Sequence, residues 1–198
     1  METPKKVIPK FKVDFIGAGA PHDQGLEELK RWCSIFHKKD LAPLYEHGSF
    51  GNLSFRIQGP PGGQTDQFII TASGLKLKDD LTDDCFVKVV TVDLKQQLIS
   101  AAGSRLPSSE TMLHAAIYQD RRDVNAVFHG HSQAILKCRE LTATQKEEPY
   151  GSRALVESVL PLLADNDFII MKNHGFLSLG ATMKAAGEKA LEVLSNCS

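Results

Sequence analysis

The chain has 198 residues, of which 42% are hydrophobic and 24% charged, and its formal net charge is −1. A chain of this length and composition can bury a core without disulfides or metal staples, which predicts a globular protein and excludes extensive disorder. Because positive charge is not in excess, there is no electrostatic reason to expect binding to nucleic acid or to an anionic membrane.

The cysteines and the apolar segments bear on cellular location. Cys33, Cys85, Cys138 and Cys197 lie far apart in sequence and form no CxxC motif, so free thiols in a reducing compartment are the expected state. No apolar stretch is long enough for the core of a signal peptide or for a membrane span. We therefore expect a cytoplasmic protein.

Residues 1–23 contain prolines and glycines without a period, which predicts an irregular lead-in before a single domain over residues 24–198. The run from Gly17 to Ala20 lacks the GxGxxG spacing of a dinucleotide-binding loop. Beyond the lead-in, apolar residues at helical spacing predict helices. The predicted helices cover residues 25–37, 40–47, 111–120, 132–140, 153–164 and 182–196.

Short stretches that are apolar, valine-rich or alternating predict strands. The predicted strands cover residues 53–58, 67–71, 86–92, 97–100, 124–129, 167–172 and 176–179. Helices flank this central group, and the strands before residue 100 follow one another along the chain. The order of elements indicates a layered α/β protein with an antiparallel-rich sheet covered by helices.

The strongest local motif is His129-Gly130-His131, which ends an apolar strand where the chain turns into a helix. Side chains alternate along a strand, so residues two apart point the same way and both imidazoles can reach one cation. Taken alone, an HxH motif is somewhat more often a pair of ordinary surface or core histidines than a metal site.

Two other positions have a similar setting. His174 follows a second apolar strand and precedes Gly175, a place for either a functional histidine or a plain turn histidine. Glu110 follows Ser108 and Ser109 at the start of a helix, where an acidic residue also simply suits the helix dipole.

Three neutral imidazoles and one carboxylate form a suitable set of ligands for Zn²⁺. We therefore predict a metal site formed by Glu110, His129, His131 and His174. Mn²⁺, Co²⁺ and Fe²⁺ also accept nitrogen and oxygen ligands, so the motif selects the site rather than the ion.

Glycine-containing polar turns predict a place for a small anion, because glycine lets backbone amides approach it and hydroxyl or amide side chains add donors. Each turn taken singly is also compatible with a simple chain reversal. The candidate anion-binding residues are Gly51, Asn52, Ser73, Gly74, Ser108 and Ser109.

Three other polar residues stand close to these motifs. His114 lies four residues after Glu110 on one helix face, where a buried helix histidine is the favoured interpretation and a partner of Glu110 the alternative. Lys76 and Lys78 follow the Ser73-Gly74 turn, where a solvated loop is favoured over contact with an anion.

Five short motifs together resemble the class II aldolase/adducin family, which includes fuculose- and rhamnulose-phosphate aldolases and ribulose-phosphate 4-epimerase. They occur in the order found in that family, and the resemblance extends over residues 24–196. The motifs are GNLSFR (51–56), ITASG (70–74), PSSE (107–110), HGH (129–131) and NHG (173–175).

The resemblance implies a three-layer α/β/α fold with a mixed, largely antiparallel sheet, and a homotetramer acting on a sugar phosphate. It implies that His129, His131 and His174 are permanent zinc ligands and that Glu110 leaves the metal to act as a base. The six residues of the candidate anion site would hold the substrate phosphate. The activity implied first is aldol cleavage of a phosphorylated ketose to dihydroxyacetone phosphate and an aldehyde.

One departure leaves the reaction open. His174 follows His131 after only 43 positions, and the intervening segment is shorter than in the sugar-phosphate aldolases. Its one tyrosine, Tyr150, does not have the setting of the tyrosine that protonates the aldehyde side in those enzymes. An epimerase, dehydratase or decarboxylase sharing the metal site is therefore the alternative. A non-catalytic adducin-like interaction domain is a second alternative, although such domains tend to lose the metal ligands.

Overall fold

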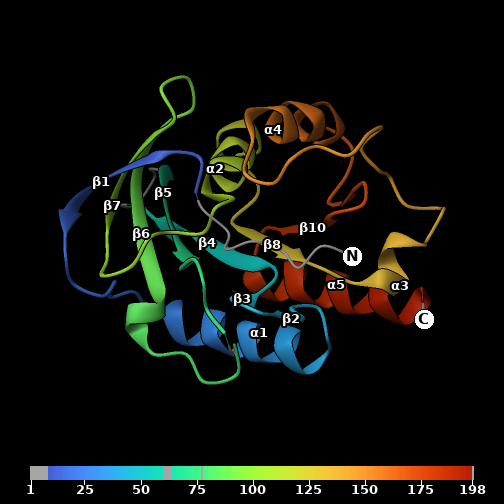
Figure 1. Ribbon diagram of the computed structural model, residues 1–198, viewed down its shortest axis with the longest axis horizontal. Helices are drawn as coiled ribbons and strands as arrows, with labels where there is room; N and C mark the ends of the chain where they lie inside the picture. Colours follow the sequence, from blue (N-terminus) through green and yellow to red (C-terminus); the bar gives the residue numbers. More distant parts are fainter. Residues whose placement is uncertain (1–8, 60–63, 77, 198) are drawn as a thin grey trace.

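The computed structural model describes residues 9–59, 64–76 and 78–197 and is built around one eight-stranded sheet (Figure 1). The strand order is β1-β7-β6-β5-β4-β8-β10-β9. The strands are β1 (Lys12–Gly17), β4 (Asn52–Gln58), β5 (Gln64–Thr71), β6 (Phe86–Asp93), β7 (Leu98–Ala102), β8 (Ala126–Gly130), β9 (Phe168–Met171) and β10 (Gly175–Gly180). Only the β1–β7 pairing is parallel, so the sheet is mixed and largely antiparallel, as predicted.

Helices cover both faces of the sheet (Figure 1). The helices are α1 (Leu26–Lys38), α2 (Thr111–Asp120), α3 (Gln133–Leu136), α4 (Arg153–Val159) and α5 (Met183–Asn196), with 3₁₀ turns at Asp83–Cys85 and Leu160–Leu162. α1 and α5 pack together on one face, and α2 and α4 pack together on the other. This is the predicted three-layer α/β/α arrangement.

The α1–α5 layer depends on one close approach. α1 buries an apolar stripe that includes Trp32 and Phe36, the spacing that predicted this helix. A Cβ atom added to Gly187 of α5 would lie 2.3 Å from the Trp32 ring, so only glycine lets the two helices pack this closely. Trp32 and Phe36 in turn pack against Phe128 of β8, which anchors the strand that carries the HxH motif.

Three predicted elements differ from the structure. Residues 12–17 of the expected irregular lead-in form β1, an edge strand that pairs with β7. Its residues are mostly exposed and do not alternate between apolar and polar, so the sequence gives no strand pattern there. Residues 40–47 are not helical: Asp40 has a φ of 54° and Pro43 disfavours helix before it, so a hairpin of β2 (Leu44–Tyr45) and β3 (Gly48–Ser49) forms. The helix expected over residues 132–140 ends at Leu136.

The expectation of free thiols was wrong for two of the cysteines. Cys138 and Cys197 form a disulfide with a Cα–Cα distance of 5.7 Å, which ties the end of α3 to the end of α5. Cys33 and Cys85 are free and buried. Within the described parts of the chain, no helix has the length and apolarity needed to cross a bilayer.

Candidate metal centre and active site

Three adjacent strands bring the predicted histidines together. His129 lies in β8, opposite Asn52 of β4 on one side and Leu177 of β10 on the other. His131 follows β8 directly, and its backbone amide donates to the Leu41 carbonyl. His174 lies in the tight turn between β9 and β10. All three imidazoles therefore reach the same end of the sheet.

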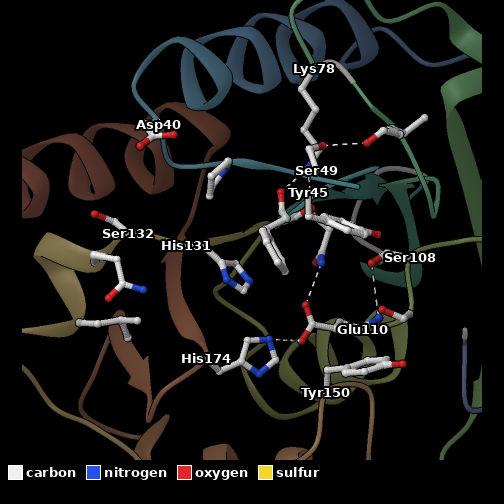
Figure 2. Close-up of a pocket in the computed structure, with 18 of the residues that line it drawn as sticks. Asp40, Tyr45, Ser49, Lys78, Ser108, Glu110, His131, Ser132, Tyr150 and His174 are labelled. Atoms are coloured by element: carbon white, nitrogen blue, oxygen red, sulfur yellow. Dashed lines mark hydrogen bonds and ion pairs between the residues drawn. The ribbon is translucent and has the colours of Figure 1, made fainter. Parts of the chain in front are cut away.

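The ligand atoms of these three histidines lie within 4.8 Å of one another. The Nε2 atoms of His129 and His131 are 3.0 Å apart. Glu110, at the N-terminus of α2, places Oε2 3.0 Å from Nε2 of His129. Its Oε1 lies 3.1 Å from Nε2 of His174 (Figure 2). The structure thus brings together all four residues predicted from the sequence.

The ring orientations are fixed from outside the cluster. Nδ1 of His129 lies 2.8 Å from the Phe176 carbonyl, so Nδ1 donates and Nε2 presents its lone pair to the cluster. The His131 ring stacks on Phe50, with centroids 4.6 Å apart. The cluster is therefore assembled before any ligand arrives.

The charges in the cluster perturb each other. Burial acts to raise the pKa of Glu110, but the His129 and His174 imidazoles outweigh it and hold that pKa well below its usual range. Burial lowers the pKa of His131 well below its usual range, and the neighbouring His129 and His174 lower it further. Burial also opposes protonation of His174, but the Glu110 carboxylate dominates and raises that pKa.

This arrangement of donors fits a divalent cation. Because Nδ1 of His129 donates to the Phe176 carbonyl, Nε2 of His129 and Oε2 of Glu110 are two acceptors facing each other at 3.0 Å, and Glu110 Oε1 is a buried acceptor without a hydrogen-bond donor of suitable geometry. A cation at the centre would satisfy every one of these lone pairs at once. Three nitrogens and a carboxylate oxygen match the preferences of zinc and of similar first-row ions.

The predicted anion-binding residues line the same pocket, which has a volume of about 1050 Å³. Gly51 has a φ of 74°, and a Cβ atom there would lie 2.6 Å from the His129 carbonyl, so this turn requires glycine. The Asn52 amide donates to Glu110 Oε2 at 2.8 Å, which links the turn to the histidine cluster.

The remaining anion-binding candidates meet where two loops pair. Ser73 and Gly74 follow β5, and the Ser73 amide donates to the Leu106 carbonyl. Ser108 donates its backbone amide to the Thr71 carbonyl, which brings the Ser108-Ser109 pair beside that turn. The structure therefore places all six candidates around one end of the pocket, next to Glu110.

Comparison with known proteins identifies the family of this chain. The profile of the Class II Aldolase and Adducin N-terminal domain matches residues 27–145, more than half of the chain. The chain belongs to this family.

Relatives within the family carry names of more than one reaction. An L-fuculose phosphate aldolase of Methanococcus maripaludis strain S2 is 29% identical over 178 residues, covering 81% of this chain and 87% of the relative. A methylthioribulose-1-phosphate dehydratase of Exiguobacterium sibiricum is 30% identical over 150 residues, covering 75% of this chain and 66% of the relative.

A solved structure of a sugar-phosphate aldolase from Thermotoga maritima shares the fold. It superimposes with a TM-score of 0.72 at 16% identity, covering 88% of this chain and 92% of that chain. At this level of identity, the likeness extends to the class II aldolase fold and not to the substrate.

Lys78 is a member of the pocket that the sequence did not reveal. It was expected in a solvated loop, but its side chain is buried and its Nζ donates to the carbonyls of Phe50 and Gly51 at 2.5 and 2.6 Å. Burial lowers the pKa of Lys78 to about 8. Lys76, two residues earlier, is exposed, as predicted. No pattern in the sequence distinguishes the two lysines.

The segment between the HxH motif and the last histidine completes the pocket. Ser132, Gln133, Ala134 and Leu136 line it around α3, and Glu147, Glu148, Pro149 and Tyr150 line it ahead of α4. Tyr150 lies in the pocket near Glu110 in Figure 2, although its sequence setting gave no reason to place it there.

Proposed function

We propose that the protein is a divalent-metal-dependent lyase that cleaves a phosphorylated ketose to dihydroxyacetone phosphate and an aldehyde. The convergence of Glu110, His129, His131 and His174 beside a glycine- and serine-rich anion cradle carries this proposal. We propose zinc as the ion, with manganese, cobalt or iron(II) as ions that the same donors accept. The ion, when bound, supplies Lewis-acid stabilisation of the negative charge that develops on substrate oxygens.

The residues of the chain divide the work. Gly51, Asn52, Ser73, Gly74, Ser108 and Ser109 hold the phosphate, and binding energy from this remote group aligns the reacting carbons. Glu110 turns from the histidines toward the substrate, accepts the proton that the substrate hydroxyl releases as the C–C bond breaks, and delivers it to the carbon that loses that bond. Because Glu110 lies 3.0 Å from His129, the proton is transferred beside the site where charge is stabilised.

A dehydratase, epimerase or decarboxylase using the same residues is the second candidate. The observation that favours it is the shortened segment between His131 and His174, whose one tyrosine, Tyr150, does not match the aldolase pattern. The relative named as a methylthioribulose-1-phosphate dehydratase supports a C–O cleavage of this kind. A non-catalytic adducin-like role is disfavoured because all four candidate ligands are present and preassembled.

The test begins with the metal content of protein purified without chelators, followed by assays on a panel of ketose phosphates. We expect about one zinc per chain and release of dihydroxyacetone phosphate from at least one member of the panel. Metal without cleavage of a C–C bond selects the second candidate. If the protein binds no divalent ion, both candidate functions are contradicted.

We also propose that the protein assembles as a homotetramer, as the family resemblance implies, and that it is cytoplasmic. Sedimentation equilibrium of the native protein tests the assembly, and a monomer at micromolar concentration contradicts it.

A further inference from the structure

A ladder of polar contacts runs through the core between β4 and α2. Every member is buried, with exposed fractions of 0–5%. The rungs are Asn52 to Glu110 at 2.8 Å, Ser54 to His114 at 2.7 Å, Ser54 to Tyr118 at 2.8 Å, and Arg56 to the Tyr118 carbonyl at 2.7 Å.

Matching periodicities make the ladder fit. Alternate residues of a strand lie on one face, roughly 6.6 Å apart, whereas every fourth residue of a helix advances about 6.0 Å. Asn52, Ser54 and Arg56 therefore stay level with Glu110, His114 and Tyr118 over the full contact. Burying so many polar groups costs stability unless each is bonded, so these contacts fix α2 in one register against β4.

Three ladder atoms have no hydrogen-bond partner: Oδ1 of Asn52, Oε1 of Glu110 and Nε2 of His114. Nδ1 of His114 is occupied by the Ser54 hydroxyl, while Nε2 of His114 is buried and makes no hydrogen bond. Burial lowers the pKa of His114 to about 3, against the opposing effect of the Glu110 carboxylate, so the ring is neutral. In the tautomer whose Nδ1 accepts from the Ser54 hydroxyl, the proton is on Nε2, which is then a donor without an acceptor.

Glu110 is the charged acceptor whose carboxylate acts on the His114 ring, where burial lowers the pKa and this carboxylate raises it. The His114 backbone amide donates to the Glu110 carbonyl at 3.2 Å, so the two residues stand one helical turn apart on the same face. A carboxylate that leaves the imidazoles of His129 and His174 stays in a buried environment, where it needs another donor to remain charged.

We propose that His114 is a positioning residue whose Nε2–H receives the Glu110 carboxylate when that carboxylate turns away from His129 and His174. This inference rests on the proposed function, in which Glu110 moves. His114 contacts neither substrate nor metal and acts through Glu110. The ladder holds the donor in place through Ser54, so the displaced base has one defined position.

Two substitutions separate this role from packing. In His114→Asn, the amide stands where Nδ1 stood, which keeps the contact with Ser54 and removes the distal donor. In His114→Gln, the amide reaches the position of Nε2 and restores a donor. A hydrogen bond to a charged group contributes about 1.5–3 kcal/mol, so we expect kcat to fall roughly 10- to 100-fold in His114→Asn and to recover most of that loss in His114→Gln. Neither variant should change zinc content.

A binding measurement makes the same comparison without turnover. Phosphoglycolohydroxamate presents two adjacent chelating oxygens and a phosphate, so its binding to the zinc protein displaces Glu110, whereas inorganic phosphate binds the cradle alone. By calorimetry, His114→Asn should weaken the hydroxamate about 10-fold or more relative to the native protein and leave phosphate affinity unchanged. His37→Asn is the matched control, because His37 on α1 also has a buried unpartnered nitrogen, and it should change neither affinity.

The outcomes are distinguishable. Equal losses of hydroxamate affinity in His114→Asn and His114→Gln, or no loss in either, overturn the role of His114 while leaving the proposed function intact. Native zinc protein that does not bind the hydroxamate overturns the proposed function and this inference together.

Discussion

The two sides of the pocket are built in different ways. The side with Glu110 and the histidines is formed by β4, β8, β10 and the start of α2, which are joined by strand pairing and by the buried polar ladder. The segment over residues 132–150, which lines the rest of the pocket, contains one short helix. It is attached by the Cys138–Cys197 disulfide, by side-chain bonds such as Asn173 to Glu147 at 3.0 Å, and by a short backbone bridge from residues 142–144 to Ile170.

This difference separates chemistry from specificity. A reaction centre on paired strands keeps its geometry to within fractions of an ångström. A loop segment that is attached at only a few points tolerates insertion, deletion and substitution. The 132–150 segment is also where the sequence departs from the sugar-phosphate aldolases. We infer that the strand-built side supplies the metal ligands and the base, and that the 132–150 segment selects the reaction and the substrate.

The largest expected effect is that of His129→Ala on the strand-built side. His129 contacts both His131 and Glu110, so its removal takes away a ligand and the partner of the base. We expect no bound zinc by atomic emission and no detectable turnover, with an unchanged far-ultraviolet circular dichroism spectrum. A variant that still holds one equivalent of metal shows that the ligand set is wrong.

Glu110→Gln should keep the metal and lose the chemistry. Glutamine retains an oxygen for the cluster and for Asn52 but cannot carry a proton, and general acid–base catalysis contributes about 10²–10⁴-fold. We expect kcat to fall by that amount while at least part of the zinc remains. Full activity in this variant removes Glu110 from the proton transfer.

Lys78→Met should affect substrate binding more than catalysis. The ammonium group holds the Gly51 turn through two backbone carbonyls, and leaving buried acceptors unsatisfied costs about 1–3 kcal/mol. We expect KM for the phosphorylated substrate to rise roughly 10-fold. Because the pKa of Lys78 is about 8, its charge is lost as the pH rises through 8, so KM of the native enzyme should rise there too.

Lys76→Met is the matched control for this prediction. Lys76 is exposed and in the same loop, so its substitution should leave KM and its pH profile unchanged. Equal effects from the two lysines indicate a general electrostatic contribution rather than a bond to the turn.

Opening the Cys138–Cys197 disulfide by Cys197→Ser should affect stability rather than chemistry. A bridge between residues 59 apart stabilises by about 2–4 kcal/mol, which corresponds to a drop in Tm of roughly 4–16 °C. We expect zinc content to be unchanged, since no histidine of the cluster lies on α3 or α5. Loss of zinc in the variant contradicts the separation of the two sides.

The smallest effect is expected for Tyr150→Phe. Its ring packs beneath Lys10, whose Nζ lies 4.5 Å from the centroid, and phenylalanine preserves that packing. We expect kcat to change by less than about threefold, because the sequence around Tyr150 does not match that of the aldolase acid, and general acid catalysis contributes at least about 100-fold where it operates. A 100-fold loss identifies Tyr150 as the proton donor on the aldehyde side and strengthens aldol cleavage over the alternatives.

The features that could be predicted from the sequence are those that depend on residues close together in the chain. Periodicity predicted α1, α2, α5 and the antiparallel strands, since burial of an apolar stripe or of alternate residues leaves a direct pattern. The HxH motif and the glycine-flanked His174 predicted the metal cluster because strand geometry fixes where neighbouring side chains point.

The other features could not be predicted, because they depend on contacts between residues that are distant in the chain and meet in the folded structure. β1 forms because residues 12–17 pair with β7, and Cys138 forms a disulfide with Cys197, which lies 59 positions away in the sequence. Lys78 and Lys76 have the same local sequence features, yet the loop around Phe50 and Gly51 buries only Lys78. His114 acquired its significance when β4 placed Ser54 on one ring nitrogen and left the other without a partner.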